Sequence, residues 1–243
     1  MNLIIDVGNT NVKLAVFQDN EIVNKQIVDL DAIDIKIIEL TKKYNNLGKA
    51  IISSVGRLSE PQIANISNCI STIVLDSKTR VPFKNKYKTP ETLGVDRIAL
   101  VSASVLKYSK NNVLIIDAGT CITYDFINTK NEYLGGAISP GISTRYKSLN
   151  NLTANLPLLK RKAPKKLIGK STKQSIHSGV INGISMEIDG IVNKYRKKYK
   201  DLTVILTGGD ADFLSKRLKS SIFANSNFLL EGLNFILEYN TNE

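Results

Sequence analysis

The sequence contains few of the residues that build disulfide frameworks and metal clusters. Its 243 residues include only two cysteines, Cys69 and Cys121, and a single histidine, His177. This content excludes a disulfide scaffold and the cysteine-rich ligand patterns of structural zinc sites. Sparse cysteine use is typical of proteins in the reducing cytoplasm, which is the location that we expect.

Long apolar runs are also missing. The longest uncharged apolar stretches, such as residues 113–116, are a few residues long, whereas a membrane-spanning helix needs about 20 apolar residues. The chain enters a strand pattern directly after Met1 and Asn2, without the basic segment and cleavage site of a signal peptide. We therefore expect neither a membrane partner nor a targeting segment.

Acidic residues are scarce relative to basic ones. The chain has 33 Lys and Arg against 22 Asp and Glu, a net charge of +11, with basic clusters at 160–166 and 194–200. Such a charge can indicate nucleic-acid binding. However, the sequence has no zinc-ligand spacing and no helix-turn-helix pattern. We therefore interpret the charge as a lysine-rich surface suited to anionic small substrates, and we do not expect a nucleic-acid partner.

An internal repeat is the most informative feature that is present. Residues 4–17 and 115–126 each form an apolar strand that ends in an aspartate, a tight turn with Gly and Thr, and a second alternating strand. The two aspartates, Asp6 and Asp117, lie about half the chain apart. A duplicated unit of this kind predicts two turns that hold the phosphates of a nucleotide from two sides.

The pattern around each repeat predicts a duplicated α/β fold. Each copy of the repeat lies at the start of a run of three predicted strands. A helix, a further strand and another helix follow each run. We predict two halves, 1–112 and 113–243, with mixed sheets flanked by helices and a cleft between them. The predicted strands are 2–7, 12–17, 21–28, 49–54, 73–75, 113–117, 121–127, 133–138 and 202–206; the predicted helices are 31–44, 61–70, 94–108, 171–199, 211–218 and 229–239, with the 171–199 helix bent at one of its glycines and loops over 81–93 and 151–170.

The first turn has the chemistry of a phosphate site. Gly8 lets backbone N–H groups approach a phosphate closely, Asn9 and Thr10 can add side-chain donors, and Lys13 supplies a cation. Asp6, at the end of its strand, is placed to hold Mg²⁺ through water rather than to contact phosphate directly.

A second glycine motif follows a late strand. The sequence has no P-loop and no dinucleotide-binding Gly-x-Gly-x-x-Gly. Gly208 and Gly209 would let an adenosine lie against the backbone, although an ordinary strand-to-helix turn can have the same sequence. The presence of two phosphate turns favours the nucleotide interpretation.

The remaining candidates have both a functional and a structural interpretation. Asp96 could be the base for an acceptor hydroxyl, or only a carboxylate in the first turn of a helix. Arg97 could bind a substrate carboxylate, or lie on the surface. His177 has no ligand partners in its segment, so we favour a structural role, and we expect Cys121 to pack as a small apolar residue.

At these residues the sequence resembles the type III pantothenate kinases, members of the acetate and sugar kinase/heat-shock/actin superfamily. The resemblance covers essentially the whole chain and rests on DVGNTNVK at 6–13, GVDR at 94–97, IDAGT at 116–120, GGAISPG at 135–141, GKST at 169–172 and TGGD at 207–210. It implies an actin-like, ribonuclease H-like fold for each half. Cys121 and His177 depart from the family pattern, which usually has alanine and a polar amide there.

The resemblance implies a transferase that phosphorylates pantothenate with ATP and Mg²⁺, giving 4′-phosphopantothenate in the first step of coenzyme A biosynthesis. It makes Asp96 the catalytic proton acceptor and Asp117 the site of a monovalent cation, K⁺ or NH₄⁺. The implied ATP-binding residues are Asp6, Val7, Gly8, Asn9, Thr10, Asn11, Val12, Lys13, Thr120, Gly208 and Gly209. The implied substrate-binding residues are Tyr87, Gly94, Val95, Asp96, Arg97 and Thr172, and Thr172 implies a homodimer, because the family takes some substrate contacts from a partner subunit.

Two other functions stay open. A non-enzymatic, nucleotide-binding transcriptional accessory factor could use the same turns, but such a sensor has no need of a base at Asp96, of Arg97 or of Lys13. A kinase of the same superfamily that acts on another small hydroxylated acid is the third hypothesis, and the context of Asp96 disfavours it.

Overall fold

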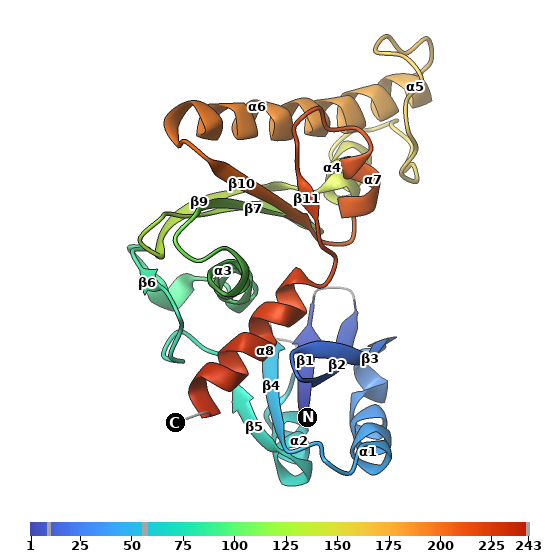
Figure 1. Ribbon diagram of the computed structural model, residues 1–243. Coiled ribbons are helices and arrows are strands. Elements are labelled where there is room, and N and C mark those ends of the chain that lie inside the picture. Colours follow the sequence, from blue (N-terminus) through green and yellow to red (C-terminus); the bar gives the residue numbers. More distant parts are fainter. Residues whose placement is uncertain (9–10, 55–57, 242–243) are drawn as a thin grey trace. The chain divides into compact units, whose positions relative to one another are not determined.

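The computed structural model describes residues 1–8, 11–54 and 58–241 and divides the chain into two compact units (Figure 1). Unit 1 comprises Met1–Ser109, Asn131–Tyr133 and Asn227–Glu243, and unit 2 comprises Lys110–Lys130 and Leu134–Ser226. None of the described helices is long and apolar enough to cross a membrane.

Unit 1 is built on a five-stranded mixed sheet in the order β3-β2-β1-β4-β5. The strands are β1 (Asn2–Val7), β2 (Val12–Gln18), β3 (Glu21–Val28), β4 (Lys49–Ser54) and β5 (Ser71–Val74). β1 pairs antiparallel with β2 and parallel with β4, and every residue of β1 is buried. Burial on both faces of a strand means that both faces of this sheet are covered.

Helices cover the sheet of unit 1 on its two faces. α1 (Ile33–Lys43) and α2 (Glu60–Cys69) pack with alternate residues of β1, β2 and β4, among them Leu3, Ile5 and Leu14. α3 (Val95–Tyr108) packs against α8 (Phe228–Thr241), and both contact β4. Short 3₁₀ turns, η1 (Leu30–Ala32) and η2 (Pro90–Thr92), precede α1 and α3.

Unit 2 contains a sheet with the strands β9-β8-β7-β10-β11 in that order. They are β7 (Asn112–Ala118), β8 (Cys121–Ile127), β9 (Glu132–Pro140), β10 (Leu202–Thr207) and β11 (Phe223–Ala224). The first residues of β9 belong to unit 1, where Glu132 and Tyr133 pair in parallel with β6 (Lys84–Asn85). β7 pairs antiparallel with β8 and parallel with β10.

The helices of unit 2 are α4 (Ile142–Asn151), α5 (Thr172–His177), α6 (Gly183–Lys198) and α7 (Ala211–Ser215). A π-helical turn, Ser178–Asn182, joins α5 and α6 into one long element (Figure 1). Ile176, Ile184 and Ile188 of this element pack with residues of β7 and β8 in one apolar core. The predicted helix over 171–199 is therefore present as α5, the π-turn and α6, and the π-turn contains Gly179, one of the glycines at which a bend was predicted.

The two sheets have the same strand order. The strands of the second sheet, β7 to β11, correspond in order to β1 to β5 of the first. The pairs β1–β2 and β7–β8 are antiparallel, and the pairs β1–β4 and β7–β10 are parallel. Such agreement in topology is what the sequence repeat predicted. The boundary between the two compact units differs from the predicted division between residues 112 and 113, because α8, near the end of the chain, belongs to unit 1. The division into duplicated halves stays a prediction.

Sequence patterns missed three elements. The sequence patterns predict no helix at α4 and no strand at β11, and the two-residue strand β6 lies in the segment 81–93 that we interpret as a loop. Ile142 and Tyr146, four residues apart on one face of α4, are its buried residues, and the rest of the helix is largely polar. A four-residue spacing that occurs once is a weak helical signal.

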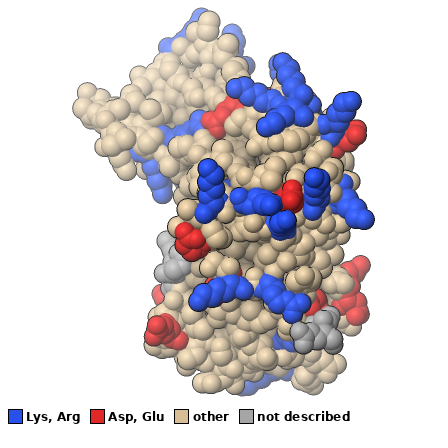
Figure 2. Space-filling model, turned by 90° about the vertical axis from the view of Figure 1, so that its left-hand side faces the viewer, with Lys and Arg blue, Asp and Glu red and all other residues tan. Residues whose placement is uncertain are grey.

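Positive side chains are spread over the surface. Figure 2 shows one face, on which Lys and Arg form several groups separated by neutral side chains, with fewer Asp and Glu among them. Several lysines are paired within unit 1, including Lys107 with Glu231 at 3.0 Å and Lys49 with Glu238 at 3.8 Å. This arrangement agrees with a solvated, lysine-rich surface.

Candidate active site

The first predicted turn joins β1 to β2 in unit 1. Asp6 lies directly opposite Lys13 in the antiparallel pair, and the Lys13 ammonium donates to the Asp6 carboxylate at 3.2 Å. The N–H of Gly8 donates to the carbonyl of Asn11 at 3.1 Å and closes the turn. Val7 and Val12 are buried on either side of it. Asn9 and Thr10 lie outside the described residues.

Asp6 is a buried carboxylate, with 6% of the residue exposed. Burial is the main cause that raises its pKa, the Lys13 ammonium opposes this effect, and the charge of Asp96 adds to it. Burial thus disfavours the ionised form of the Asp6 carboxylate, and a further positive charge nearby would favour it.

A divalent cation beside Asp6 would supply that charge. No group of three or more His, Cys, Asp or Glu side chains suited to a metal exists among the described residues. Mg²⁺ commonly uses one or two carboxylates together with water and phosphate oxygens. The residues present thus fit a Mg²⁺ ion that Asp6 holds through water, and they do not fit an all-protein metal cage.

Asp96 occupies the first turn of α3. Its Oδ1 accepts a hydrogen bond at 2.8 Å from the backbone N–H of Arg97. Gly94 caps the helix, and a side chain there would come within 2.4 Å of the same carboxylate oxygen. The glycine leaves room for the Asp96 carboxylate at the helix N-terminus.

Arg97 is a buried cation with aromatic neighbours. It is 5% exposed, and its Nη2 donates to the hydroxyl of Tyr133 at 2.8 Å. Its guanidinium lies 5.6 Å from the ring centroid of Tyr87, and the Tyr87 and Tyr133 rings stack at 6.0 Å. Two aromatic rings thereby hold the guanidinium in one orientation, as recognition of a planar carboxylate requires.

Tyr133 is the residue of this cluster that the sequence did not single out. It is wholly buried, and its carbonyl accepts from the N–H of Lys86, the residue that follows Asn85 of β6. Tyr87 and Arg97, by contrast, were predicted from the sequence. In the sequence, only an aromatic residue at the start of a strand marks Tyr133.

The second turn joins β7 to β8 in unit 2. The N–H of Gly119 donates to the carbonyl of Cys121 at 2.9 Å. The carbonyl of Thr120 accepts from the N–H of Gly141 at 3.0 Å and from the hydroxyl of Thr144 at 2.6 Å. The start of α4 thus holds this turn, and Gly141 is required there because a side chain would come within 2.0 Å of the Gly119 carbonyl. Cys121 is exposed, so the expectation that it packs as an apolar residue is wrong.

Asp117 is the last residue but one of β7 and lies against the third motif. Gly208 has a φ of +93°, and a side chain there would come within 2.3 Å of the Asp117 carboxylate. The N–H of Asp210 donates to the carbonyl of Ala118 at 2.9 Å. A side chain at Gly209 would meet no atom within 4 Å, so this backbone is open on one side. Both features suit a flat ligand group against the turn.

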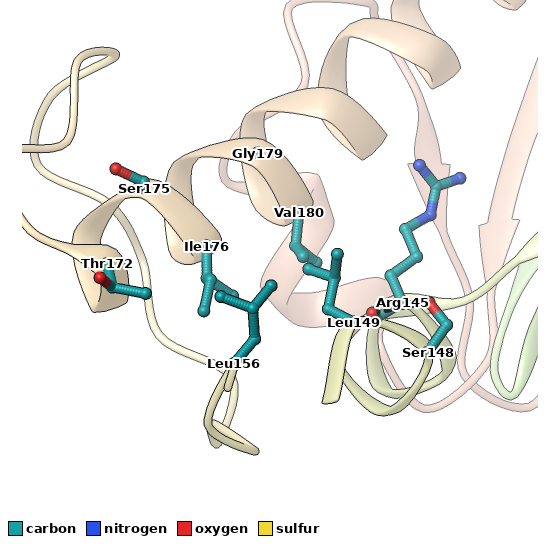
Figure 3. Close-up of a pocket in the computed structure, with 9 residues that line it drawn as sticks. All are labelled: Arg145, Ser148, Leu149, Leu156, Thr172, Ser175, Ile176, Gly179 and Val180. Atoms are coloured by element: carbon teal, nitrogen blue, oxygen red, sulfur yellow. Dashed lines mark hydrogen bonds between the residues drawn. The ribbon is translucent and has the colours of Figure 1, made fainter. Parts of the chain in front are cut away.

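Thr172 lies on an apolar groove of about 520 Å³ in unit 2. Figure 3 shows the side chains of Leu149, Leu156, Ile176 and Val180 pointing toward one another in this groove, while Ser175 points away. Thr172 begins α5 at one end of the groove.

His177 has a structural partner in unit 2. Its Nδ1 lies 2.8 Å from the Tyr146 hydroxyl, and the two rings meet edge-on. Burial is the first cause that lowers its pKa, and the nearby Lys162 adds to the effect. The neutral imidazole is thus favoured, which agrees with the structural role predicted from the sequence.

Comparison with known proteins gives one consistent result. Residues 2–194 match the family model described as type III pantothenate kinase. The chain is 55% identical over 240 residues to the type III pantothenate kinase of Christiangramia forsetii, which covers 99% of each chain. It is 46% identical over 239 residues to that of Flavobacterium johnsoniae, with 98% of each chain covered.

Solved structures show the fold. The chain is similar to a conserved Campylobacter jejuni protein assigned to the Baf family of transcriptional activators, with a TM-score of 0.67, 23% identity and 99% and 100% of the two chains covered. It is also similar to a glucokinase from an Antarctic psychrotroph, with a TM-score of 0.54, 11% identity and 98% of each chain covered. These likenesses confirm the predicted actin-like and sugar-kinase-like α/β fold.

Proposed function

The chain belongs to the type III pantothenate kinase family, and on that premise we propose how its residues share the transfer of a phosphoryl group from ATP to pantothenate. The reaction is the ATP-dependent phosphorylation of pantothenate to 4′-phosphopantothenate, the first step of coenzyme A biosynthesis. Within unit 1, the observation that carries the assignment is the buried Asp6 carboxylate, which the Lys13 ammonium pairs at 3.2 Å at the turn between β1 and β2.

Asp96 accepts the proton of the pantothenate hydroxyl as that hydroxyl attacks the γ-phosphorus. Its position in the first turn of α3, with Oδ1 bonded to the Arg97 N–H, fixes the orientation of the carboxylate. Phosphoryl transfer depends mainly on positioning and on stabilising charge on the transferred oxygens. Lys13 and the backbone N–H groups of its turn are suited to the second task.

A Mg²⁺ ion held by Asp6 through water would neutralise phosphate charge. The desolvated Asp6 carboxylate supports this assignment, because burial without further positive charge raises its pKa. Lys13 supplies one positive charge, 3.2 Å from the Asp6 carboxylate.

Arg97 binds the carboxylate of pantothenate. The side chain is buried beneath Tyr87 and Tyr133, so a bound carboxylate would be shielded from water on the aromatic side. Gly94 and Val95 place their backbone beside it at the start of α3. This pocket distinguishes an acid with a planar carboxylate from a neutral sugar.

The residues of unit 2 serve the nucleotide and a monovalent cation. We assign Thr120 to phosphate, and Gly208 and Gly209 to the adenosine, since the turn they form is open beside Gly209. Asp117 binds K⁺ or NH₄⁺. Its carboxylate lies at the meeting point of β7 and the Gly208 turn, where backbone carbonyls such as that of Ala118 are close by. Carboxylate and carbonyl oxygens are the ligands that hard cations use.

The decisive experiment measures ADP release from Mg²⁺·ATP with and without pantothenate, in K⁺ and in Na⁺ buffer. We expect turnover that requires pantothenate and is faster in K⁺. In Asp117→Ala the rate in K⁺ should fall to the rate in Na⁺, because the carboxylate that distinguishes the cation is gone. Pantothenate-dependent turnover with an unchanged K⁺ response in this variant would contradict the cation site alone.

A kinase-inactive chain would favour the regulator. If ATP binds but no acceptor among pantothenate and other small hydroxylated acids is phosphorylated, and duplex DNA binds with a steep salt dependence, the accessory-factor hypothesis replaces the kinase. Family membership and the buried, aromatic-held Arg97 disfavour that outcome.

We also propose a homodimer in the cytoplasm. Thr172 lies apart from the Asp96 and Arg97 cluster in sequence and on an apolar groove, and exposed apolar side chains, Leu152 at 82% and Ile168 at 78%, lie on the same unit. A second copy would cover such side chains. Light scattering should give twice the mass of one chain, and a strictly monomeric active enzyme would contradict the proposal.

A further inference from the structure

Residues 152–171 of unit 2 form a connection without helix or strand between α4 and α5, which we call the strap. It contains the basic cluster 160–166. The strap is bonded to the unit along its length. The Asn150 side chain donates to the Leu156 carbonyl at 2.7 Å, and the Ser178 hydroxyl donates to the Leu167 carbonyl.

Arg161 makes the most specific of these contacts. Its Nη1 forms a hydrogen-bonded ion pair with Oδ1 of Asp210. Its guanidinium lies 4.7 Å from the ring centroid of Phe213, and that of Arg217 lies 4.8 Å from the same ring. The Asp210 side chain is 16% exposed and that of Arg161 is 40% exposed, so the pair is partly withdrawn from water. A planar guanidinium can form an ion pair and lie over an aromatic ring at once, whereas a lysine ammonium cannot do both equally well.

Asp210 belongs to the turn that follows β10. Its N–H donates to Ala118 at the end of β7, and the N–H of Ala211 donates to the carbonyl of Gly208 at 3.2 Å. The turn is therefore held from one side by β7 and from the other by the strap. Gly209 lies between these two attachments, with open space beside it.

We propose that Arg161 is a positioning residue for the nucleoside end of ATP, which acts through Asp210 to fix the shape of the Gly208–Gly209 backbone. This inference rests on the assignment of those glycines to the nucleotide in the proposed function. It gives the basic strap a role beyond solvation, and it separates Arg161 from the neighbouring lysines, for which surface charge is the whole role.

The test compares Arg161→Gln with Lys160→Gln, which removes the same charge from the adjacent strap position. Arg161→Gln should raise the KM for ATP by about three- to tenfold, the range for a charged hydrogen bond discounted for partial exposure. The kcat at saturating ATP and the KM for pantothenate should change by less than about twofold, because Asp96 and Arg97 are untouched. Lys160→Gln should leave all three constants unchanged, and Arg161→Lys should restore part of the ATP effect.

A double-mutant cycle tests the route through Asp210. Asp210→Asn should raise the KM for ATP to a similar extent, and the double variant should be little worse than either single one, since both changes break the same contact. Additive effects would overturn the proposal. Equal KM values for ATP in Arg161→Gln and Lys160→Gln would overturn it as well.

Limited trypsin digestion provides a readout that does not need turnover. Arg161→Gln removes one cleavage site from the strap, yet we expect faster cleavage at the remaining lysines between 160 and 166, because the strap is released from the turn. Mg²⁺·ATP should slow this cleavage in the wild-type protein more than in the variant. Cleavage as slow as that of Lys160→Gln would contradict the inference. By contrast, a wild-type protein without pantothenate-dependent ADP release would contradict the proposed function instead.

Discussion

Replacing Asp96 by asparagine should lower kcat by about 10²–10⁴, the usual loss when a general base is removed, while the KM for ATP stays close to its original value. Asparagine keeps the size of the side chain and can still accept the hydrogen bond that the Arg97 N–H gives to Oδ1 at 2.8 Å. It cannot take up the proton of the attacking hydroxyl. Steady-state ADP release with both substrates at saturation measures the loss.

The competing interpretation of Asp96, a carboxylate that only stabilises a helix N-terminus, makes a different prediction. It predicts a lower melting temperature and an unchanged kcat per folded molecule. Asp34→Asn is the matched control, because Asp34 is also the second residue of a helix and lies in the first turn of α1. Asp34→Asn should leave kcat unchanged. If Asp96→Asn retains full activity, Asp96 is not the base.

The repeated strands could be predicted from the sequence because their burial is extreme. β1 and β7 are apolar runs that end in an aspartate, and the residues within them are almost entirely buried. A tight turn then fixes the antiparallel register, which places Asp6 opposite Lys13 and Asp117 opposite Thr123. Local pattern and tertiary environment agree at these strands, so the sequence predicts both the fold and the position of the two aspartates.

The missing parts of the site depend on contacts between distant segments. The hydrogen bond from Arg97 to Tyr133 joins residues 36 positions apart, and the ion pair of Arg161 with Asp210 joins residues 49 positions apart. The two-residue strand β6 forms because it pairs with the start of β9, and its own residues have no local pattern that predicts a strand. A sequence pattern indicates which side chains of a segment are buried, but not which other segment they contact. The contacts of Tyr133 with Arg97 and of Asp210 with Arg161 could therefore not be predicted.

Replacing Lys13 by methionine should lower kcat/KM for ATP by about 10²–10³, the usual effect of removing a group that stabilises charge in the transition state. Methionine keeps the unbranched apolar part of the side chain and removes the ammonium that lies 3.2 Å from Asp6. Lys25→Met on β3, which loses a hydrogen bond to Asn227 at 2.7 Å, is the matched control and should keep full activity.

The same variant should be destabilised in a pH-dependent way. Burial already raises the pKa of Asp6, and Lys13 opposes that shift, so its removal raises the pKa further. An acid with a pKa above its unfolded value loses stability as pH rises through the folded pKa. The free energy of unfolding of Lys13→Met should therefore match the wild type below about pH 4, the unfolded range of an aspartate, and fall below it toward neutral pH. Denaturant titrations across this range measure the difference.

A second substitution separates the two effects of Lys13. Adding Asp6→Asn to Lys13→Met removes the unpaired buried charge and should restore stability at neutral pH. It should not restore activity, because the ammonium that faces the phosphates is still absent and the carboxylate beside the divalent cation is lost as well. If the double variant recovers both stability and turnover, Lys13 serves only to neutralise Asp6, and the phosphate charge is stabilised by the backbone of the turn instead.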